Sequence, residues 1–295
     1  MARPAQHDGD RRPRGSAAHE PGAACAGPLR AVTAVSQTID LPGGRIAWLE
    51  SGEGPPLLLV HGIGGEAGAW THQLGSLSAG RRVLAWDAPG YGGSAPLAGS
   101  GHVDRLLEWL DALKITRLDA VGHSLGAIFL ALLARARPGL LRRVVLLHPM
   151  AGMGALPAEE REALRLARIE ELRELGPDGF AALRGGAILG RAASDTARAR
   201  AIAVMAAVPA AGYLAAWEAL VAADIMPLLP ALSGPALVIS GEDDKGSPPE
   251  LGRRIAAALP RAGFFLMPGV GHYAPIEAPA ALDELLLAFL NEDTP

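Results

Sequence analysis

Ser124 is the residue whose surroundings point most directly to chemistry. It is the middle residue of GHSLG, at 122–126, between an apolar strand-like run at 118–121 and an apolar helix-like stretch that continues to about Arg135. A turn of the G-x-S-x-G type from strand to helix is very tight, so the glycines avoid collisions with neighbouring elements and the serine stays exposed. Ser124 is therefore a candidate nucleophile. The alternative is that its side chain only caps the helix.

A serine hydroxyl needs a base to remove its proton and an acid to orient that base. His272 ends the glycine-rich loop 269–272, which follows the last strand-like run, so its imidazole could reach across the strand ends. A surface histidine is the alternative. The loop GEDD, which follows the strand-like run at 236–240, supplies Asp243 and Asp244 as candidate acids.

Acyl chemistry at a serine also needs two N–H donors for the oxyanion. The amide of Leu125 lies at the positive end of the predicted helix. The amide of Ile63 lies in HGIGG, at 61–65, where glycines let the backbone approach a substrate closely. A glycine-rich turn could instead bind phosphate, but the chain has neither G-x-G-x-x-G nor a Walker lysine. We interpret His61 as structural, and Asp87 as a carboxylate that fixes a loop or supports the site.

The elements that position these residues follow a repeating pattern. Segments 35–40 and 45–50 alternate like strands around Leu41-Pro42-Gly43-Gly44 and predict a hairpin. Short apolar runs then alternate with helix-like stretches, as expected for parallel strands buried on both faces. The runs predicted as strands are 56–60, 82–86, 118–121, 143–147, 236–240 and 263–267. The pattern predicts an α/β fold with a mostly parallel, doubly wound sheet.

One interval, 148–235, has no strand-like run, and its pattern is typical of helices. The expected helices are at 158–175, 196–208 and 211–222. We interpret it as a helical cap inserted between two strands, rather than as a second independent domain. The expected organisation is a disordered extension at 1–34, a core at 35–149 and 231–295, and a cap at 150–230. Apolar residues that could line a pocket, or be plain core, are Trp217, Tyr213, Phe129, Met205 and Phe180.

These motifs together resemble the α/β-hydrolase superfamily from about Ser36 onward. They are HGIGG at 61, DAPGYGGS at 87, VGHSLGA at 121, GEDD at 241 and GVGHYAPIEAP at 269. Within that superfamily the chain is most similar to 3-oxoadipate enol-lactonases and related carboxylic-ester hydrolases. The resemblance implies a catalytic triad of Ser124, Asp244 and His272, with Asp244 favoured over Asp243 because the acid lies three residues past Gly241. It also implies Ile63 and Leu125 as oxyanion donors, without a cofactor.

Charge and composition limit the classes of binding partner that we expect. The net charge of −4 gives no general attraction to nucleic acid or anionic lipid, and no apolar run has the length of a membrane span. The histidines lack metal-ligand spacing and H-E-x-x-H is absent, so we expect no metal. A lone cysteine, Cys25, predicts no intramolecular disulfide. We expect a cytoplasmic protein that acts on a small molecule.

The leading functional hypothesis is hydrolysis of a small carboxylic ester or lactone through an acyl-enzyme. Carbon–carbon bond hydrolysis of aromatic ring-cleavage products shares the fold and the triad, and is the second hypothesis. From another class, the fold could serve as a non-catalytic receptor or binding module. A dehalogenase or epoxide hydrolase would need an aspartate at position 124.

Overall fold

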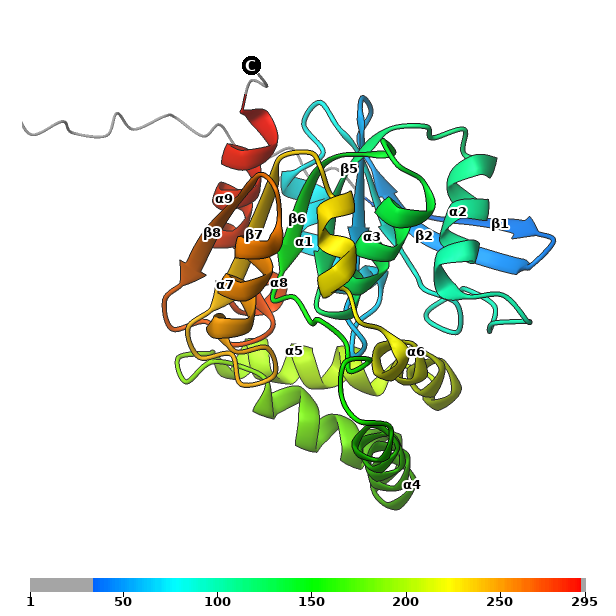
Figure 1. The fold of residues 1–295 in the computed structure, drawn as a ribbon, viewed down its shortest axis with the longest axis vertical. Helices are drawn as coiled ribbons and strands as arrows, with labels where there is room; N and C mark the ends of the chain where they lie inside the picture. The colour runs from blue at the N-terminus through cyan, green and yellow to red at the C-terminus, as the bar shows by residue number, and fades with distance from the viewer. Residues whose placement is uncertain (1–33, 293–295) are drawn as a thin grey trace, which may run out of the picture. The chain divides into compact units, whose positions relative to one another are not determined.

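The computed structural model describes residues 34–292, which contain an eight-stranded sheet with helices on both faces. The strand order is β1-β2-β4-β3-β5-β6-β7-β8 (Figure 1). Pairing is antiparallel from β1 to β2 and from β2 to β4, and parallel in the rest of the sheet. The predicted fold class is confirmed.

The strands lie close to where the sequence predicts them. Their bounds are Val35–Leu41 (β1), Gly44–Ser51 (β2), Pro56–Val60 (β3), Arg82–Trp86 (β4), Leu118–His123 (β5), Leu141–Leu147 (β6), Ala236–Gly241 (β7) and Ala262–Met267 (β8). The hairpin β1–β2 and the bounds of β3 and β4 are confirmed. Strand β5 extends two residues further than expected, up to His123, so Ser124 follows the strand directly.

Helices cover the sheet because successive strand residues face opposite sides and both sides are apolar. On one side, Leu58 and Val60 of β3 join a cluster with helices α2 (His102–Ala112), α3 (Leu125–Ala136) and α7 (Pro249–Ala258). On the other side, Leu57 and Leu59 pack with α1 (Thr71–Ser76) and α9 (Pro279–Asn291). The remaining short helices are η1 (Ala67–Trp70), η2 (Met226–Ala231) and α8 (Ala274–Glu277).

Three helices between β6 and β7 form what we call the helical insertion: α4 (Ala158–Ala187), α5 (Asp195–Ala206) and α6 (Ala210–Ala222). The sequence predicts a helix that ends at Leu175, but α4 continues to Ala187 with a kink. Gly176 has φ +66°, which favours glycine, and Pro177 follows it. The chain thus changes direction and resumes a helix, where the sequence pattern indicated only a stop.

The helical insertion is joined to the sheet by close backbone contacts. A Cβ at Gly212 of α6 would overlap the carbonyl oxygen of Gly90, in the loop after β4. At the other end, a Cβ at Gly190 would lie 2.8 Å from the amide nitrogen of Gly271, in the loop after β8. Side chains at these positions would push the insertion away from the strand ends. The tight contacts therefore bring α4–α6 over the loops that carry the predicted site (Figure 1).

The prediction of a disordered extension at 1–34 lies almost entirely outside the described residues. Within 34–292, no single helix has the length and apolar composition needed to cross a membrane. Helices α5 and α6 pass that test only as a pair, and they are bent by 94° relative to each other.

Candidate active site

Ser124 lies at the sharp turn between β5 and α3. Its backbone has φ +53° and ψ −110°, a conformation that a non-glycine residue rarely adopts and that stores local strain. A Cβ at Gly122 would lie 2.6 Å from the carbonyl oxygen of Gly126, and a Cβ at Gly126 would overlap the carbonyl oxygen of Val60. The spacing of the two glycines is therefore a steric requirement of this turn.

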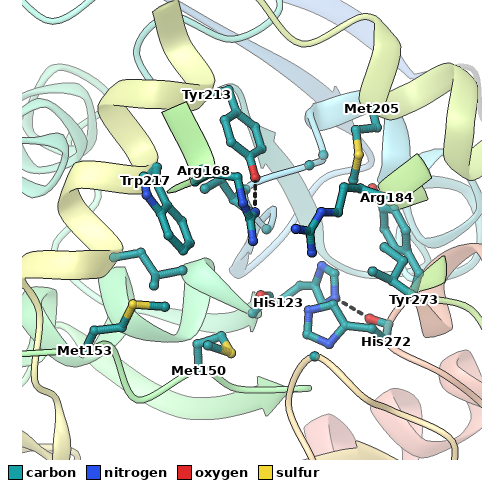
Figure 2. Close-up of a pocket in the computed structure, with 18 residues that line it drawn as sticks. His123, Met150, Met153, Arg168, Arg184, Met205, Tyr213, Trp217, His272 and Tyr273 are labelled. Carbon is teal, nitrogen blue, oxygen red and sulfur yellow. Dashed lines mark hydrogen bonds between the residues drawn. The ribbon is translucent and has the colours of Figure 1, made fainter. Parts of the chain in front are cut away.

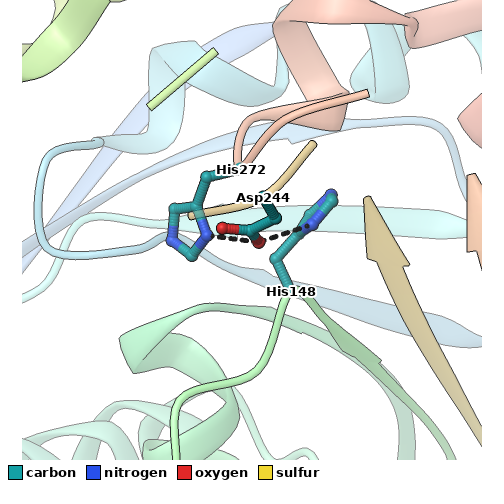
Figure 3. Close-up of side chains that lie close together, drawn as sticks. All are labelled: His148, Asp244 and His272. Atoms are coloured by element: carbon teal, nitrogen blue, oxygen red, sulfur yellow. Dashed lines mark hydrogen bonds and ion pairs between the residues drawn. The ribbon is translucent and has the colours of Figure 1, made fainter. Parts of the chain in front are cut away.

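Asp244 and His272 form a hydrogen-bonded pair (Figure 3). His272 Nδ1 lies 2.7 Å from Asp244 Oδ2. The other carboxylate oxygen, Oδ1, accepts from the amides of Gly246 and Ser247, at 2.9 and 2.8 Å. Burial alone would raise the pKa of Asp244, but the imidazoles of His148 and His272 beside it hold it below its ordinary value. The carboxylate is therefore ionised and fixed against the imidazole.

His148 is a second histidine beside the same carboxylate, a position that the sequence pattern did not predict. Its Nδ1 accepts from the amide of Gly241 at 3.1 Å and also lies 3.2 Å from Asp244 Oδ2. The residue follows β6, has φ +45° and is fully buried. Burial lowers the pKa of His148, so the ring is neutral at pH 7.

The backbone of His272 is fixed from both sides. Its amide donates to the carbonyl of Ile188, at the end of α4, at 2.7 Å. Its carbonyl accepts from Nε2 of His123 at 2.7 Å, so that nitrogen carries the proton. Burial lowers the pKa of His123 well below its ordinary value. The Glu277 carboxylate accepts from the amides of Gly271 and Tyr273, at 2.9 and 2.8 Å, and so closes the loop.

The two predicted oxyanion donors have free amides. Leu125 is the first residue of α3, and Ile63 lines the same cavity as Ser124. Among residues 34–292, no group accepts a hydrogen bond from either amide. The hydroxyl of Tyr91 donates to the carbonyl of Ile63 at 3.0 Å, which helps to fix the orientation of this peptide.

His61 and Asp87 hold loops, in agreement with their interpretation from sequence. His61 Nε2 accepts from the amide of Ala88 at 3.1 Å, so Nδ1 carries the proton and donates to the carbonyl of Gly62 at 2.8 Å. Asp87 accepts from the amides of Ala67 and Gly93, at 2.8 and 3.3 Å.

A cavity of about 230 Å³ opens over Ser124 and His272 (Figure 2). Its walls are mostly apolar and come from both the core loops and the helical insertion. Of the predicted pocket residues, Met205, Tyr213 and Trp217 line it. Phe129 does not line it: its ring stacks on His102 of α2, with ring centroids 5.0 Å apart. Phe180 packs against Tyr213 instead of reaching the cavity.

Two arginines of α4, Arg168 and Arg184, also line the cavity, and the sequence did not single them out. Their guanidinium groups point into it (Figure 2). In the sequence of a charged helix, an arginine that lines a cavity cannot be distinguished from one on the outer surface. The kink at Gly176 is what brings residues from both halves of α4 to one place.

His148, Asp244 and His272 together present one nitrogen or oxygen ligand each within 4.8 Å of one another, a spacing that could hold a metal ion. Here, however, both Nδ1 atoms are directed at the same carboxylate oxygen. The geometry is thus that of a hydrogen-bonded acid–base cluster.

Comparison with known proteins agrees with the fold and the motifs. The profile of the α/β hydrolase fold family matches residues 55–279. (E)-2-((N-methylformamido)methylene)succinate hydrolase of Acinetobacter baylyi is 28% identical over 88% of this chain and 100% of its own length. A relative from Agrobacterium fabrum, named for carbamate hydrolysis, is 31% identical over 81% of this chain and 94% of its own. The enol-lactonase of Burkholderia xenovorans superposes with a TM-score of 0.77 and 27% identity, over 87% of this chain and 100% of that one.

The chain belongs to the α/β-hydrolase fold family and is a hydrolase. The predicted resemblance to enol-lactonases is confirmed at the level of the superfamily and its enol-lactonase-like members. The bonds named for these relatives differ, so the bond cleaved by this chain is a separate question.

Proposed function

We propose that this hydrolase cleaves a small carboxylic ester or lactone through an acyl-enzyme on Ser124. His272 acts as general base and Asp244 orients it, while the amides of Ile63 and Leu125 stabilise the oxyanion. Residues 150–230 serve as the cap, and Met205, Tyr213 and Trp217 form part of the substrate pocket. The proposal assigns Asp243 no catalytic role.

In the first half of the reaction, Ser124 Oγ attacks the carbonyl carbon as His272 takes its proton. The tetrahedral intermediate collapses when His272 returns that proton to the leaving alcohol oxygen, which gives the acyl-enzyme. In the second half, His272 removes a proton from water, the hydroxide attacks the acyl carbon, and the proton returns to Ser124. A lactone follows the same steps, with its own alcohol remaining attached to the acyl chain.

The single observation that carries the proposal is that His272, hydrogen-bonded at 2.7 Å to the ionised Asp244, lines the same cavity as Ser124. Among the described residues, no hydrogen bond yet joins Ser124 Oγ to His272. Such contacts often tighten only when substrate is bound. The helical insertion would help this step, because it covers the strand ends and limits the access of water.

An active-site label tests the nucleophile independently of the substrate. A fluorophosphonate should label the purified protein at one serine. Ser124→Ala should abolish labelling, while Ser76→Ala, at a half-buried serine on α1 outside the cavity, should not. Retained labelling of Ser124→Ala would contradict the proposal.

A substrate panel tests the reaction class. Short-chain p-nitrophenyl esters, lactones and ring-cleavage dienoates should be assayed with the wild type and with Ser124→Ala. We expect Ser124-dependent turnover of esters or lactones, reduced by at least about 10³-fold in the variant. Turnover of dienoates alone would favour carbon–carbon hydrolysis, and equal rates in both proteins would favour a non-catalytic binding module.

A further inference from the structure

The cavity over Ser124 contains an uncompensated positive charge. Arg184 donates from Nε and Nη2 to the carboxylate of Glu171, with Nη2 at 2.7 and 2.8 Å from the two oxygens. Arg168 lies on the same carboxylate, with Nε 3.4 Å from Oε2. Two guanidinium groups therefore share one carboxylate, and the cluster has a net charge of +1.

Each arginine keeps donors that face the cavity. Arg168 Nη1 donates to the hydroxyl of Tyr213 at 2.6 Å, and its guanidinium carbon lies 4.4 Å from the ring centre of Trp217. Within residues 34–292, no group accepts from Nη2 of Arg168 or from Nη1 of Arg184. These two groups are free to bind a ligand.

Tyr213 adds a third donor to this set. Its oxygen accepts from Arg168, so its own proton is available, and no described group accepts it. Burial raises the pKa of Tyr213, which keeps the hydroxyl protonated. Two charged N–H groups and one O–H group therefore converge on one side of the cavity.

The rest of the cavity wall increases the effect of this charge. Other parts of the wall are apolar side chains that cannot neutralise a cation: Met150, Met153, Met205, Ile188 and Trp217. A charge beside apolar surface is poorly solvated and binds an opposite charge more strongly than it would in water. Arginine suits a planar carboxylate because its N–H groups form a fork.

We propose that Arg168, Arg184 and Tyr213 form a subsite for a carboxylate on the acyl portion of the substrate, so that the acid product is a dicarboxylate. The proposal rests on the ester or lactone hydrolysis proposed above. The acyl portion stays attached to Ser124 through both half-reactions, so a cation that holds its far end positions the scissile carbonyl in each of them.

The alternative role for the cluster is structural, since the Arg184–Glu171 pair joins the two halves of α4 across the kink at Gly176. One carboxylate and one guanidinium would suffice for that purpose. A purely structural ion pair would not explain why Arg168 is also present, or why both arginines keep unpaired N–H groups.

Paired substrates separate these roles. Mono-p-nitrophenyl esters of succinic, glutaric and adipic acid are compared with neutral p-nitrophenyl esters of the same chain length. We expect the wild type to prefer one carboxylate ester by about 10- to 100-fold in kcat/KM, the range given by hydrogen bonds to charged groups. Arg184→Gln should reduce kcat/KM for the preferred carboxylate ester by about 10- to 100-fold more than for the matched neutral ester, while Arg184→Lys should restore part of the preference.

Arg173→Gln is the matched control, because Arg173 is an exposed arginine of the same helix and pairs with Glu170. It should change neither substrate. Equal loss on charged and neutral esters in Arg184→Gln would mean that Arg184 only braces α4, and would overturn the proposal. So would a wild-type enzyme without preference for carboxylate esters.

Binding without turnover separates this proposal from the hydrolytic one. Calorimetry on Ser124→Ala should detect glutarate but not glutaramide, and adding Arg184→Gln should abolish glutarate binding. If no ester or lactone is cleaved but this binding holds, the subsite stands and the hydrolytic function fails. If esters are cleaved through Ser124 and glutarate does not bind, the subsite fails and the function stands.

Discussion

Asp244 is the residue on which the proposed chemistry depends most. One of its oxygens faces two imidazoles, those of His272 and His148, and the other accepts two backbone amides. A carboxylate with four such neighbours has little freedom to rotate. Its neighbour Asp243 instead pairs with the exposed Arg191, with Nη2 2.9 Å from Oδ1. The two aspartates are neighbours in one loop but are therefore in different chemical environments.

Asp244→Asn should lower kcat by about 10³- to 10⁴-fold, because an amide neither favours the correct tautomer of His272 nor stabilises its charged form. Asp243→Asn should change kcat by less than about threefold. Steady-state kinetics on a Ser124-dependent substrate gives both values. A larger loss in Asp243→Asn would exchange the assigned roles.

His148→Asn should lower kcat by about tenfold with little change in KM, since Asp244 would lose the imidazole that packs 3.2 Å from its Oδ2 and helps to fix its carboxylate. His148 does not line the cavity, so it acts by positioning Asp244. Active-site titration with a fluorophosphonate corrects for unfolded protein. If kcat per labelled site equals that of the wild type, His148 has only a structural role.

At the scale of elements, the turn between β5 and α3 holds Ser124 in place through two small residues. Gly126→Ala should destabilise the protein by at least about 2 kcal/mol, because the new methyl group would overlap the carbonyl of Val60. Gly75→Ala is the opposite case: it lies in α1, where a Cβ meets nothing within 4 Å, and should stabilise by about 0.5–1 kcal/mol. Urea unfolding measures both.

Much of the fold and part of the site could be predicted from sequence. Strands β3 and β4 are short apolar runs between polar turns, so their ends are unambiguous. Ser124, Asp244 and His272 each follow such a strand, and the carboxyl ends of parallel strands meet at one edge of the sheet. Local pattern and topology were sufficient to predict Ser124 and His272 at this edge, whereas the choice of Asp244 over Asp243 came from the resemblance to α/β hydrolases.

The pocket wall could not be predicted in the same way. Phe129 and Met205 are both apolar residues of helices, and only the packing of those helices decides that Met205 reaches the cavity. Arg168 and Arg184 are brought together by the change of direction at Gly176. A glycine followed by proline predicts that a helix stops, but not where the next one points.

At the scale of the whole molecule, buried histidines are a common feature. His61, His102, His123 and His148 are all buried, and burial lowers the pKa of each. For His102 the pKa falls to about 4. The folded protein therefore holds these rings neutral at pH values where the unfolded chain protonates them.

Stability should consequently fall as the pH is lowered from about 6.5 toward 4, because the unfolded state binds more protons in that window. His102 alone should contribute on the order of 3 kcal/mol of this loss, from its shift of roughly 2.5 pKa units. Asp244, whose pKa is lowered, adds to the loss below about pH 4.

Urea unfolding at pH 7.5, 6.5, 5.5 and 4.5 measures this slope. In His102→Phe the slope should decrease between pH 6.5 and 4.5, since one proton uptake is removed. A stability that is independent of pH in this window would show that the buried rings are protonated in the folded state.

The hydrogen bond from the His272 amide to the carbonyl of Ile188 has a consequence for building hybrid enzymes. The helical insertion, which lines the cavity, thus also fixes the backbone that carries the His272 imidazole. A hybrid could take the first helix of the helical insertion, α4, from a relative. If the downstream junction lies before Ile188, the substrate preference would change while the hydrogen bond to His272 is kept. A junction after Ile188 would exchange the cavity lining and the partner of the His272 amide together. A loss of turnover in such a hybrid could then come from a displaced His272 as well as from poor substrate fit.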